Sequence, residues 1–237
     1  MTTSKSIIVN PKYAQLKQYL EKMPEHWDNQ EGKVIYKGRN ELREIEIEGV
    51  TMVVKAFRKP NMVNQLAYGI LRPSKAKRSY EYAQMLLERG FGTPEPIGYY
   101  TERNGLLFGR SFYACLKSEC NFTYAHLMDG RYPNQERVLK AIARLTAHFH
   151  EQGWMHKDYS RGNILFQETP EEVKLEIIDL NRIRFKKVDM ETGCKNFERL
   201  PGTPEMLYIL AKEYAEVRGF DAEQCYEIIK KHREKES

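Results

Sequence analysis

The chain is poor in cysteine and lacks long apolar runs. Its four cysteines, Cys115, Cys120, Cys194 and Cys225, form no paired motif, which suits a reducing compartment and disfavours a disulfide framework. No stretch approaches the roughly 20 apolar residues that a membrane-spanning helix needs. The apolar part of the amino-terminal sequence is too short for a secretory signal. We therefore expect a cytoplasmic protein.

Size and charge narrow the classes further. The 237 residues are enough for one compact, two-lobed protein with a substantial core. The net charge is +5, but no nucleic-acid-binding module is recognisable, so nucleic acid is not an expected partner. Residues 58–78 interleave basic and apolar side chains. This composition fits either a peripheral contact with an anionic membrane surface or an ordinary loop and helix.

The most informative segment contains two acidic residues and one asparagine at fixed spacing. Asp158 precedes Asn163 by five residues, and Asp179 follows Asn163 by sixteen, after an apolar run. Phosphoryl transfer needs one carboxylate near the acceptor hydroxyl, while an amide oxygen and a second carboxylate hold magnesium against the ATP phosphates. Short strands are predicted at 164–166 and 175–178. Their pairing would bring Asn163 and Asp179 to neighbouring loop ends.

An amino-terminal strand supplies a candidate lysine. Residues 50–57 predict a strand in which Val53, Lys55 and Phe57 share one face, because side chains alternate along a strand. A buried lysine needs a charged partner, so Lys55 is the candidate for the lysine that contacts the ATP phosphates, with Val53 against the adenine. The same pattern also allows a strand whose lysine faces solvent.

The carboxylate expected to pair with Lys55 is Glu81, the single acid between positions 58 and 87. It falls within a predicted helix over 74–89, which Ser74 caps and Gly90 ends. Glu88, further along the same helix, is the alternative partner.

The turn that would cover the phosphates is poor in glycine. Strands predicted around 34–36 and 42–47 enclose Gly38 and Asn40, where protein kinases place several glycines. A single glycine is also typical of an ordinary hairpin. If this turn covers nucleotide, backbone N–H groups and the side chains of Arg39 and Asn40 would make more of the phosphate contacts.

The carboxy-terminal part is predicted to be mainly helical. A helix over 136–152 has an apolar stripe and ends at Gly153, and another begins at Thr203 and Pro204. The run Arg182, Arg184, Lys186 and Lys187 is either a solvated surface or an electrostatic seat for an anionic acceptor. Residues 230–237 are highly charged and are predicted to fray.

Four segments together resemble the bacterial lipopolysaccharide kinases that phosphorylate Kdo or heptose sugars of the lipid A inner core. They are Ser74 to Ala83, Gly92 to Gly98, His156 to Leu165 and Ile178 to Arg182. The resemblance covers most of the chain. The Asp158 loop alone would fit any relative of the protein-kinase fold, including antibiotic and choline kinases.

The resemblance implies an α+β, bilobal protein-kinase-like fold. Residues 1–117 would form a lobe with an antiparallel sheet and one helix, and residues 118–237 a mainly helical lobe with the catalytic and metal loops. Asp158 would be the catalytic carboxylate, Lys55 would hold the phosphates and Glu81 would orient it. Asn163 and Asp179 would bind Mg²⁺. Asp179-Leu180-Asn181 stands where protein kinases have Asp-Phe-Gly, which favours a site that is always assembled.

The expected reaction is ATP-dependent phosphorylation of a sugar hydroxyl, with Kdo of lipid A as the first choice of acceptor. It would take place at the cytoplasmic face of the inner membrane. Two alternatives stay open. One is a kinase of a soluble small molecule or a protein, since fold kinship does not fix the acceptor. The other is a nucleotide-binding scaffold without catalysis.

Overall fold

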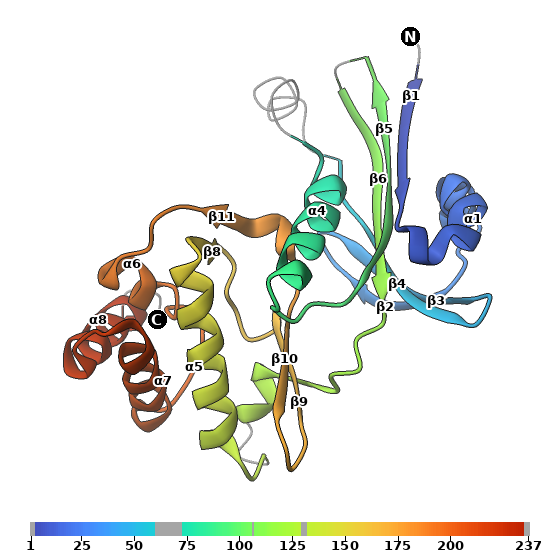
Figure 1. Ribbon diagram of the computed structural model, residues 1–237. Helices are drawn as coiled ribbons and strands as arrows, with labels where there is room; N and C mark the ends of the chain where they lie inside the picture. Colours follow the sequence, from blue (N-terminus) through green and yellow to red (C-terminus); the bar gives the residue numbers. More distant parts are fainter. Residues whose placement is uncertain (1–2, 60–72, 106, 129–131, 235–237) are drawn as a thin grey trace. The chain divides into compact units, whose positions relative to one another are not determined.

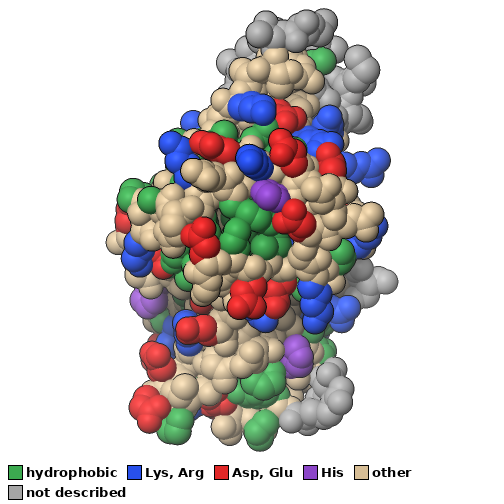
Figure 2. Space-filling view, turned by 90° about the vertical axis from the view of Figure 1, so that its right-hand side faces the viewer, with side chains coloured by type: hydrophobic (Ala, Val, Ile, Leu, Met, Phe, Trp, Pro, Cys, Tyr) green, Lys and Arg blue, Asp and Glu red, His purple; other side chains and the backbone are tan. Residues whose placement is uncertain are grey.

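The computed structural model describes residues 3–59, 73–105, 107–128 and 132–234. The chain divides into two compact units, one formed by residues 1–90 and 94–117 and the other by residues 91–93 and 118–237 (Figure 1). Within the described ranges, no helix combines the length and the hydropathy required to cross a membrane. Acidic and basic side chains are interspersed over the face shown in Figure 2.

The first unit is built on a six-stranded antiparallel sheet in the order β1-β5-β6-β4-β3-β2. Its strands are β1 (Thr3–Val9), β2 (Lys33–Lys37), β3 (Glu41–Ile47), β4 (Val50–Ala56), β5 (Pro96–Asn104) and β6 (Leu107–Leu116). Its helical segments are η1 (Pro11–Leu16), α1 (Lys17–Glu21), α2 (Met23–Asp28) and α4 (Lys75–Glu88).

Each face of this sheet has its own apolar cluster, because side chains alternate along the strands. Met52 and Val54 of β4 pack with Leu16 and Leu20 of the amino-terminal helical segment. On the other face, Phe57 packs with Ala76 and Tyr80 of α4 and with Tyr99 and Tyr113 of β5 and β6. The alternation predicted for the segment 50–57 is therefore present, and Lys55 falls on the side of the sheet that α4 covers.

Helix α4 begins and ends where the sequence predicts. The side chain of Ser74 accepts a hydrogen bond of 3.0 Å from the backbone N–H of Lys77, which caps the first turn. Gly90 follows the last turn with φ of +77°, a conformation that glycine adopts without steric cost.

The second unit is mainly helical and carries two small sheets, β10-β9-β7 and β11-β8. Its strands are β7 (Phe122–Thr123), β8 (Trp154–His156), β9 (Ile164–Glu168), β10 (Val173–Ile177) and β11 (Ile183–Phe185). Its helices are η2 (Tyr124–Leu127), α5 (Gln135–Glu151), η3 (Leu180–Arg182), α6 (Met190–Lys195), α7 (Pro204–Arg218) and α8 (Ala222–Glu234). The fully buried Val138, Ile142, Leu210 and Tyr214 of α5 and α7 belong to its core.

The α+β, protein-kinase-like fold class is confirmed. One strand was not predicted, and one detail of the prediction is wrong. Residues 3–9, considered above only as too short a signal, form β1, which pairs along its whole length with β5. Residues 230–234 do not fray but continue α8. Ile229 is buried, and Arg233 donates hydrogen bonds to the carbonyls of Glu198 and Leu200, which together hold the end of the helix in place.

Candidate active site

Strand pairing brings the two predicted metal-binding loops together. β9 and β10 are antiparallel, with Ile164 opposite Ile177. The backbone N–H of Ile178 donates to the carbonyl of Asn163 over 3.0 Å. Asn163, just before β9, and Asp179, just after β10, therefore lie at the same end of this sheet, as the sequence predicts.

A buried histidine holds the loop that carries Asp158. The Nδ1 atom of His156 accepts from the backbone N–H of Asp158 at 3.2 Å. Its Nε2 atom therefore carries the proton and lies 3.1 and 3.2 Å from the carbonyls of Ile178 and Asp179. The ring is fully buried, and this burial lowers the pKa of His156. One neutral imidazole thus ties the Asp158 loop to the Asp179 loop.

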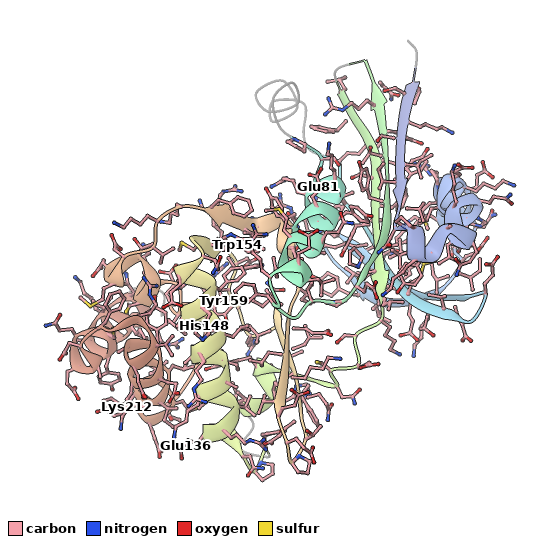
Figure 3. All side chains as sticks on the ribbon, in the orientation of Figure 1. Glu81, Glu136, His148, Trp154, Tyr159 and Lys212 are labelled. Carbon is pink, nitrogen blue, oxygen red and sulfur yellow. The ribbon has the colours of Figure 1, made fainter. Side chains whose placement is uncertain are left out.

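The rest of the loop is fixed by short contacts. Asn163 donates through Nδ2 to the carbonyl of Asp158 at 2.7 Å and to the hydroxyl of Ser160 at 3.3 Å. Tyr159, labelled in Figure 3, is 2 % exposed, and its hydroxyl lies 2.7 Å from Oγ1 of Thr146 on α5. The side chain of Tyr159 thus anchors the loop to the helical core, and the neighbouring Asp158 is left partly exposed.

Asp179 has an unusual backbone conformation and a fixed carboxylate. Its φ of 59° and ψ of 41° lie in the left-handed region, which costs energy for most residues but is tolerated by aspartate and is often found at functional sites. The buried Asn181 donates through Nδ2 to Oδ1 of Asp179 at 2.6 Å. This contact gives the asparagine of Asp179-Leu180-Asn181 a clear role, which is to orient the carboxylate.

A second buried histidine, His150, supports the Asp158 loop indirectly through Asn196. Asn196, after α6, donates through Nδ2 to the carbonyl of His156 at 2.9 Å, so its Oδ1 accepts from Nε2 of His150 at 3.0 Å. Nδ1 of His150 lies 2.9 Å from the hydroxyl of Tyr214. Burial lowers the pKa of His150 to about 4. His148 on the same helix is exposed and pairs with Glu151 at 3.0 Å (Figure 3).

The donor set at the two loop ends fits magnesium. Both of the hydrogen bonds described above for the Asn163 side chain use its Nδ2 atom. The amide oxygen therefore points away from the Asp158 carbonyl and the Ser160 hydroxyl. Asp179 contributes a carboxylate whose Oδ2 lies 3.9 Å from Nε of Arg182. Amide and carboxylate oxygens are hard ligands, and Mg²⁺ is commonly held by one or two of them together with substrate phosphates. Among the described residues, no group of three or more His, Cys, Asp or Glu side chains forms an all-protein metal site.

The carboxylate of Asp158 lines a pocket of about 760 Å³. The other lining residues are Ser160, Arg161, Gly162, Glu198, Arg199, Pro201 and Arg233. Arg199 makes an ion pair with Oδ1 of Asp158 through Nη1. Pockets of this size suit small-molecule substrates. A carboxylate in the wall of such a pocket can accept a proton from a bound hydroxyl.

The predicted nucleotide residues of the first unit lie on β4 and α4. Nζ of Lys55 lies 5.3 Å from the ring centroid of Phe57, and Val53 on the same face is opposite Cys115 of β6. Glu81 is labelled on α4 in Figure 3 and lies 3.5 Å from Nζ of Lys77 in a half-exposed pair. Lys55 lies on the side of the sheet that α4 covers, which is consistent with a Lys55–Glu81 pair. That pair stays a prediction.

The predicted phosphate-covering turn is the β2–β3 hairpin. The backbone N–H of Gly38 donates to the carbonyl of Asn40 at 3.0 Å, and Oδ1 of Asn40 accepts from the N–H of Arg58 at 3.3 Å. Most of the basic and apolar segment that begins at Arg58, residues 60–72, lies outside the described residues.

Sequence reasoning missed the arginines of the pocket. Arg199 precedes α7 and Arg233 belongs to α8, far along the chain from Asp158, so no local spacing links them to it. Arg161 lies in the Asp158 loop, between Asp158 and Asn163, but an arginine at this position does not by itself indicate a binding role. Neither Asn181 nor Asn196 was assigned a role, although a polar residue two positions after Asp179 was a usable signal.

The first unit has an antiparallel sheet with α4 on one face. The second unit is mainly helical and carries the two loops that contain Asp158, Asn163 and Asp179. This combination defines a phosphotransferase of the protein-kinase-like fold. Comparison with family sequence patterns makes this assignment specific. Residues 25–207, more than half of the chain, match the lipopolysaccharide kinase (Kdo/WaaP) family. The protein therefore belongs to this family of kinases. A comparison with curated proteins gives no significant match.

One solved structure supports the fold assignment. The protein is similar to a structure described as WaaP in complex with acyl carrier protein, with a TM-score of 0.63 and 16% sequence identity over 97% of this chain and 98% of that one. A second similar structure is the bifunctional kinase-methyltransferase WbdD, with a TM-score of 0.48 and 16% identity over 83% of this chain and 43% of that one.

Proposed function

We propose that this kinase transfers the γ-phosphoryl group of ATP to a hydroxyl of Kdo in the lipid A inner core, at the cytoplasmic face of the inner membrane. Family membership supports the reaction class. The observation that carries the site assignment is the position of Asp158. Its carboxylate lines a pocket, while its backbone is tied through His156 to the loop that presents Asp179.

In the proposed mechanism, Asp158 receives the acceptor hydroxyl through a hydrogen bond. The hydroxyl oxygen forms a bond to the γ-phosphorus, and the bond from that phosphorus to the β,γ-bridging oxygen breaks, leaving its electron pair on ADP. The hydroxyl proton passes to Asp158 late in the step and then to solvent. Burial of the neighbouring His156 and Tyr159 holds Asp158 in position before the acceptor arrives.

Asn163 and Asp179 would hold Mg²⁺, which when bound neutralises charge on the phosphates. In the first unit, Lys55 would contact the phosphates, Glu81 would orient Lys55, and Val53 would pack against the adenine. Gly38 would let the hairpin backbone approach the phosphates, and Asn40 would contact them through its Nδ2 donor, because the N–H of Gly38 is already bonded to the carbonyl of Asn40.

The test is transfer of label from [γ-³²P]ATP. The acceptors are a lipid A precursor carrying Kdo, the same precursor without Kdo, an aminoglycoside and a generic protein. We expect label on the Kdo-bearing precursor alone, located on the sugar by mass spectrometry. Label on the aminoglycoside or the protein, with none on the lipid, would overturn the proposed acceptor. ATP-dependent stabilisation against heat without transfer to any acceptor would favour a nucleotide-binding scaffold.

A further inference from the structure

Three guanidinium groups line the pocket beside Asp158. Arg161, Arg199 and Arg233 all line it, together with the two acids Asp158 and Glu198. These arginines come from three separate parts of the second unit, which are the Asp158 loop, the segment before α7, and α8. Guanidinium groups bind carboxylates and phosphates through paired N–H donors.

We propose that these arginines, with Arg199 at their centre, form a subsite for an anionic group of the acceptor. The acceptor would then carry a carboxylate or a phosphate monoester within reach of the hydroxyl that is phosphorylated. This inference rests on the proposed function, since it takes the pocket as the place where the acceptor binds.

The ion pair between Arg199 and Asp158 reduces the electrostatic repulsion that an anion would meet beside Asp158. An anionic acceptor would be repelled by the nearby catalytic carboxylate if that charge were uncompensated. Nη1 of Arg199 contacts Oδ1 of Asp158, and a carboxylate has a second oxygen that can accept a hydrogen bond from the acceptor hydroxyl. A guanidinium carries five N–H donors, so it can contact Asp158 and a second anion together.

The wall that carries Arg199 is held rigidly on both sides. Arg233 donates to the carbonyls of Glu198 and Leu200 through Nη1. Leu200 is fully buried, and the hydroxyl of the buried Tyr124 donates to the carbonyl of Pro201 at 2.8 Å. The backbone on both sides of Arg199 is therefore fixed, while its side chain is 46% exposed. A subsite that is formed before binding costs little to order when the acceptor arrives.

The arginines proposed for anion binding are not the basic residues that the sequence pattern indicated. The run Arg182 to Lys187 was interpreted as either a solvated surface or an electrostatic seat for the acceptor, and none of its residues lines the pocket. Arg182 lies beside Asp179, and Lys187 is exposed beyond β11. Lys187 is therefore a suitable control, because Lys187→Gln removes one positive charge from the same unit without touching the pocket.

The first experiment compares Arg199→Gln and Lys187→Gln with the native protein, using acceptors that keep or lack their anionic groups. One derivative has the Kdo carboxylate as its methyl ester, and the other has its phosphates removed. For Arg199→Gln we expect the KM for the anionic acceptor to rise about tenfold or more, the loss typical of a charge-assisted hydrogen bond. The KM for ATP should stay near the native value, and Lys187→Gln should behave as native.

The derivatives separate an anion contact from mere positioning of Asp158. If Arg199 binds the anion, the native protein prefers the anionic acceptor and Arg199→Gln loses that preference. Whether the methyl ester or the dephosphorylated acceptor weakens binding identifies the group. If Arg199 only positions Asp158, kcat falls equally for all acceptors and the preference survives, which would overturn the proposal.

A binding measurement keeps the test independent of turnover. Free Kdo is titrated by ligand-observed NMR into the native protein and both variants, with a non-hydrolysable ATP analogue at saturation to block the phosphate site. We expect binding that Arg199→Gln weakens and Lys187→Gln does not. This result without any phosphoryl transfer would defeat the proposed function and leave the subsite standing. The same titration is repeated with inorganic phosphate, which tests the second anion. Transfer in the native protein, with equal binding of Kdo and equal binding of phosphate by all three proteins, would defeat the subsite alone.

Discussion

The Asp158 loop of the second unit and the β2–β3 hairpin of the first are held in different ways. Around Asp158, the buried side chains of His156, Tyr159 and Asn196 each bond to a partner distant in sequence. In the hairpin, every residue of β2 is exposed. β2 pairs with β3, with a register shift near Val34, and the turn residue Asn40 accepts one hydrogen bond from the N–H of Arg58. The Asp158 loop is fixed by buried side chains, whereas β2 of the hairpin contributes exposed side chains and pairs through its backbone with β3.

This difference predicts how each region responds to change. Disturbing the Asp158 loop should cost catalysis or folding stability, because its geometry is shared with the core. Disturbing the hairpin should change nucleotide affinity with little effect on stability, since exposed residues contribute little to folding.

The largest effect is expected at Asp158. Asp158→Asn keeps the shape of the side chain but removes the group that accepts the proton, so kcat should fall by about 10²- to 10⁴-fold. Steady-state kinetics measures this loss, and ATP-dependent thermal stabilisation checks that nucleotide binding persists. Glu171→Gln, an exposed acid in the β9–β10 turn, is the control. Near-native turnover of Asp158→Asn would remove Asp158 from the mechanism.

Acid should destabilise the support behind the loop. The pKa of His150 is about 4 in the folded protein, against the 6.5 of an unperturbed histidine, so the unfolded chain binds more protons between these limits. The free energy of unfolding should therefore fall as pH drops from about 6.5 to about 4, by about 3 kcal/mol. Urea unfolding at several pH values measures this loss.

His150→Gln should make that pH profile flatter, while His148→Gln, in an exposed position on the same helix, should leave it unchanged. The lowered pKa of His156 acts in the same direction, so His150→Gln should remove only part of the slope. An unaltered slope in His150→Gln would show that the buried imidazole does not govern acid stability.

The smallest effect is expected in the hairpin. Asn40→Ala removes one amide, a loss of about 0.5–1.5 kcal/mol in binding, so the KM for ATP should rise a few-fold while kcat and the midpoint of thermal unfolding stay near native. Gly38→Ala should fold normally, because an added Cβ would meet the hydroxyl end of the exposed Tyr36 side chain, which can move. A large loss of stability in either variant would contradict the contrast between the two regions.

The sequence was sufficient where function depends on local pattern. The spacing of Asp158, Asn163 and Asp179, with strands between them, predicted the neighbouring loop ends that β9 and β10 form. The alternation around Lys55 and the capping of α4 by Ser74 were also readable, because both are short-range. Contacts between distant segments, such as Arg199 with Asp158 or β1 with β5, could not be predicted. The local sequence around either partner does not indicate which distant segment it contacts.

The assembly of one metal site from Asn163 and Asp179 is the claim on which the remaining assignments depend. Its most direct measurement is a titration of Mn²⁺, as a spectroscopic substitute for Mg²⁺, into the protein with ATP, followed by electron paramagnetic resonance. We expect Asp179→Asn and Asn163→Leu each to weaken the protein-bound Mn²⁺–ATP signal about tenfold or more, and Glu171→Gln to leave it unchanged. Equal Mn²⁺–ATP binding in all four proteins would contradict the assignment.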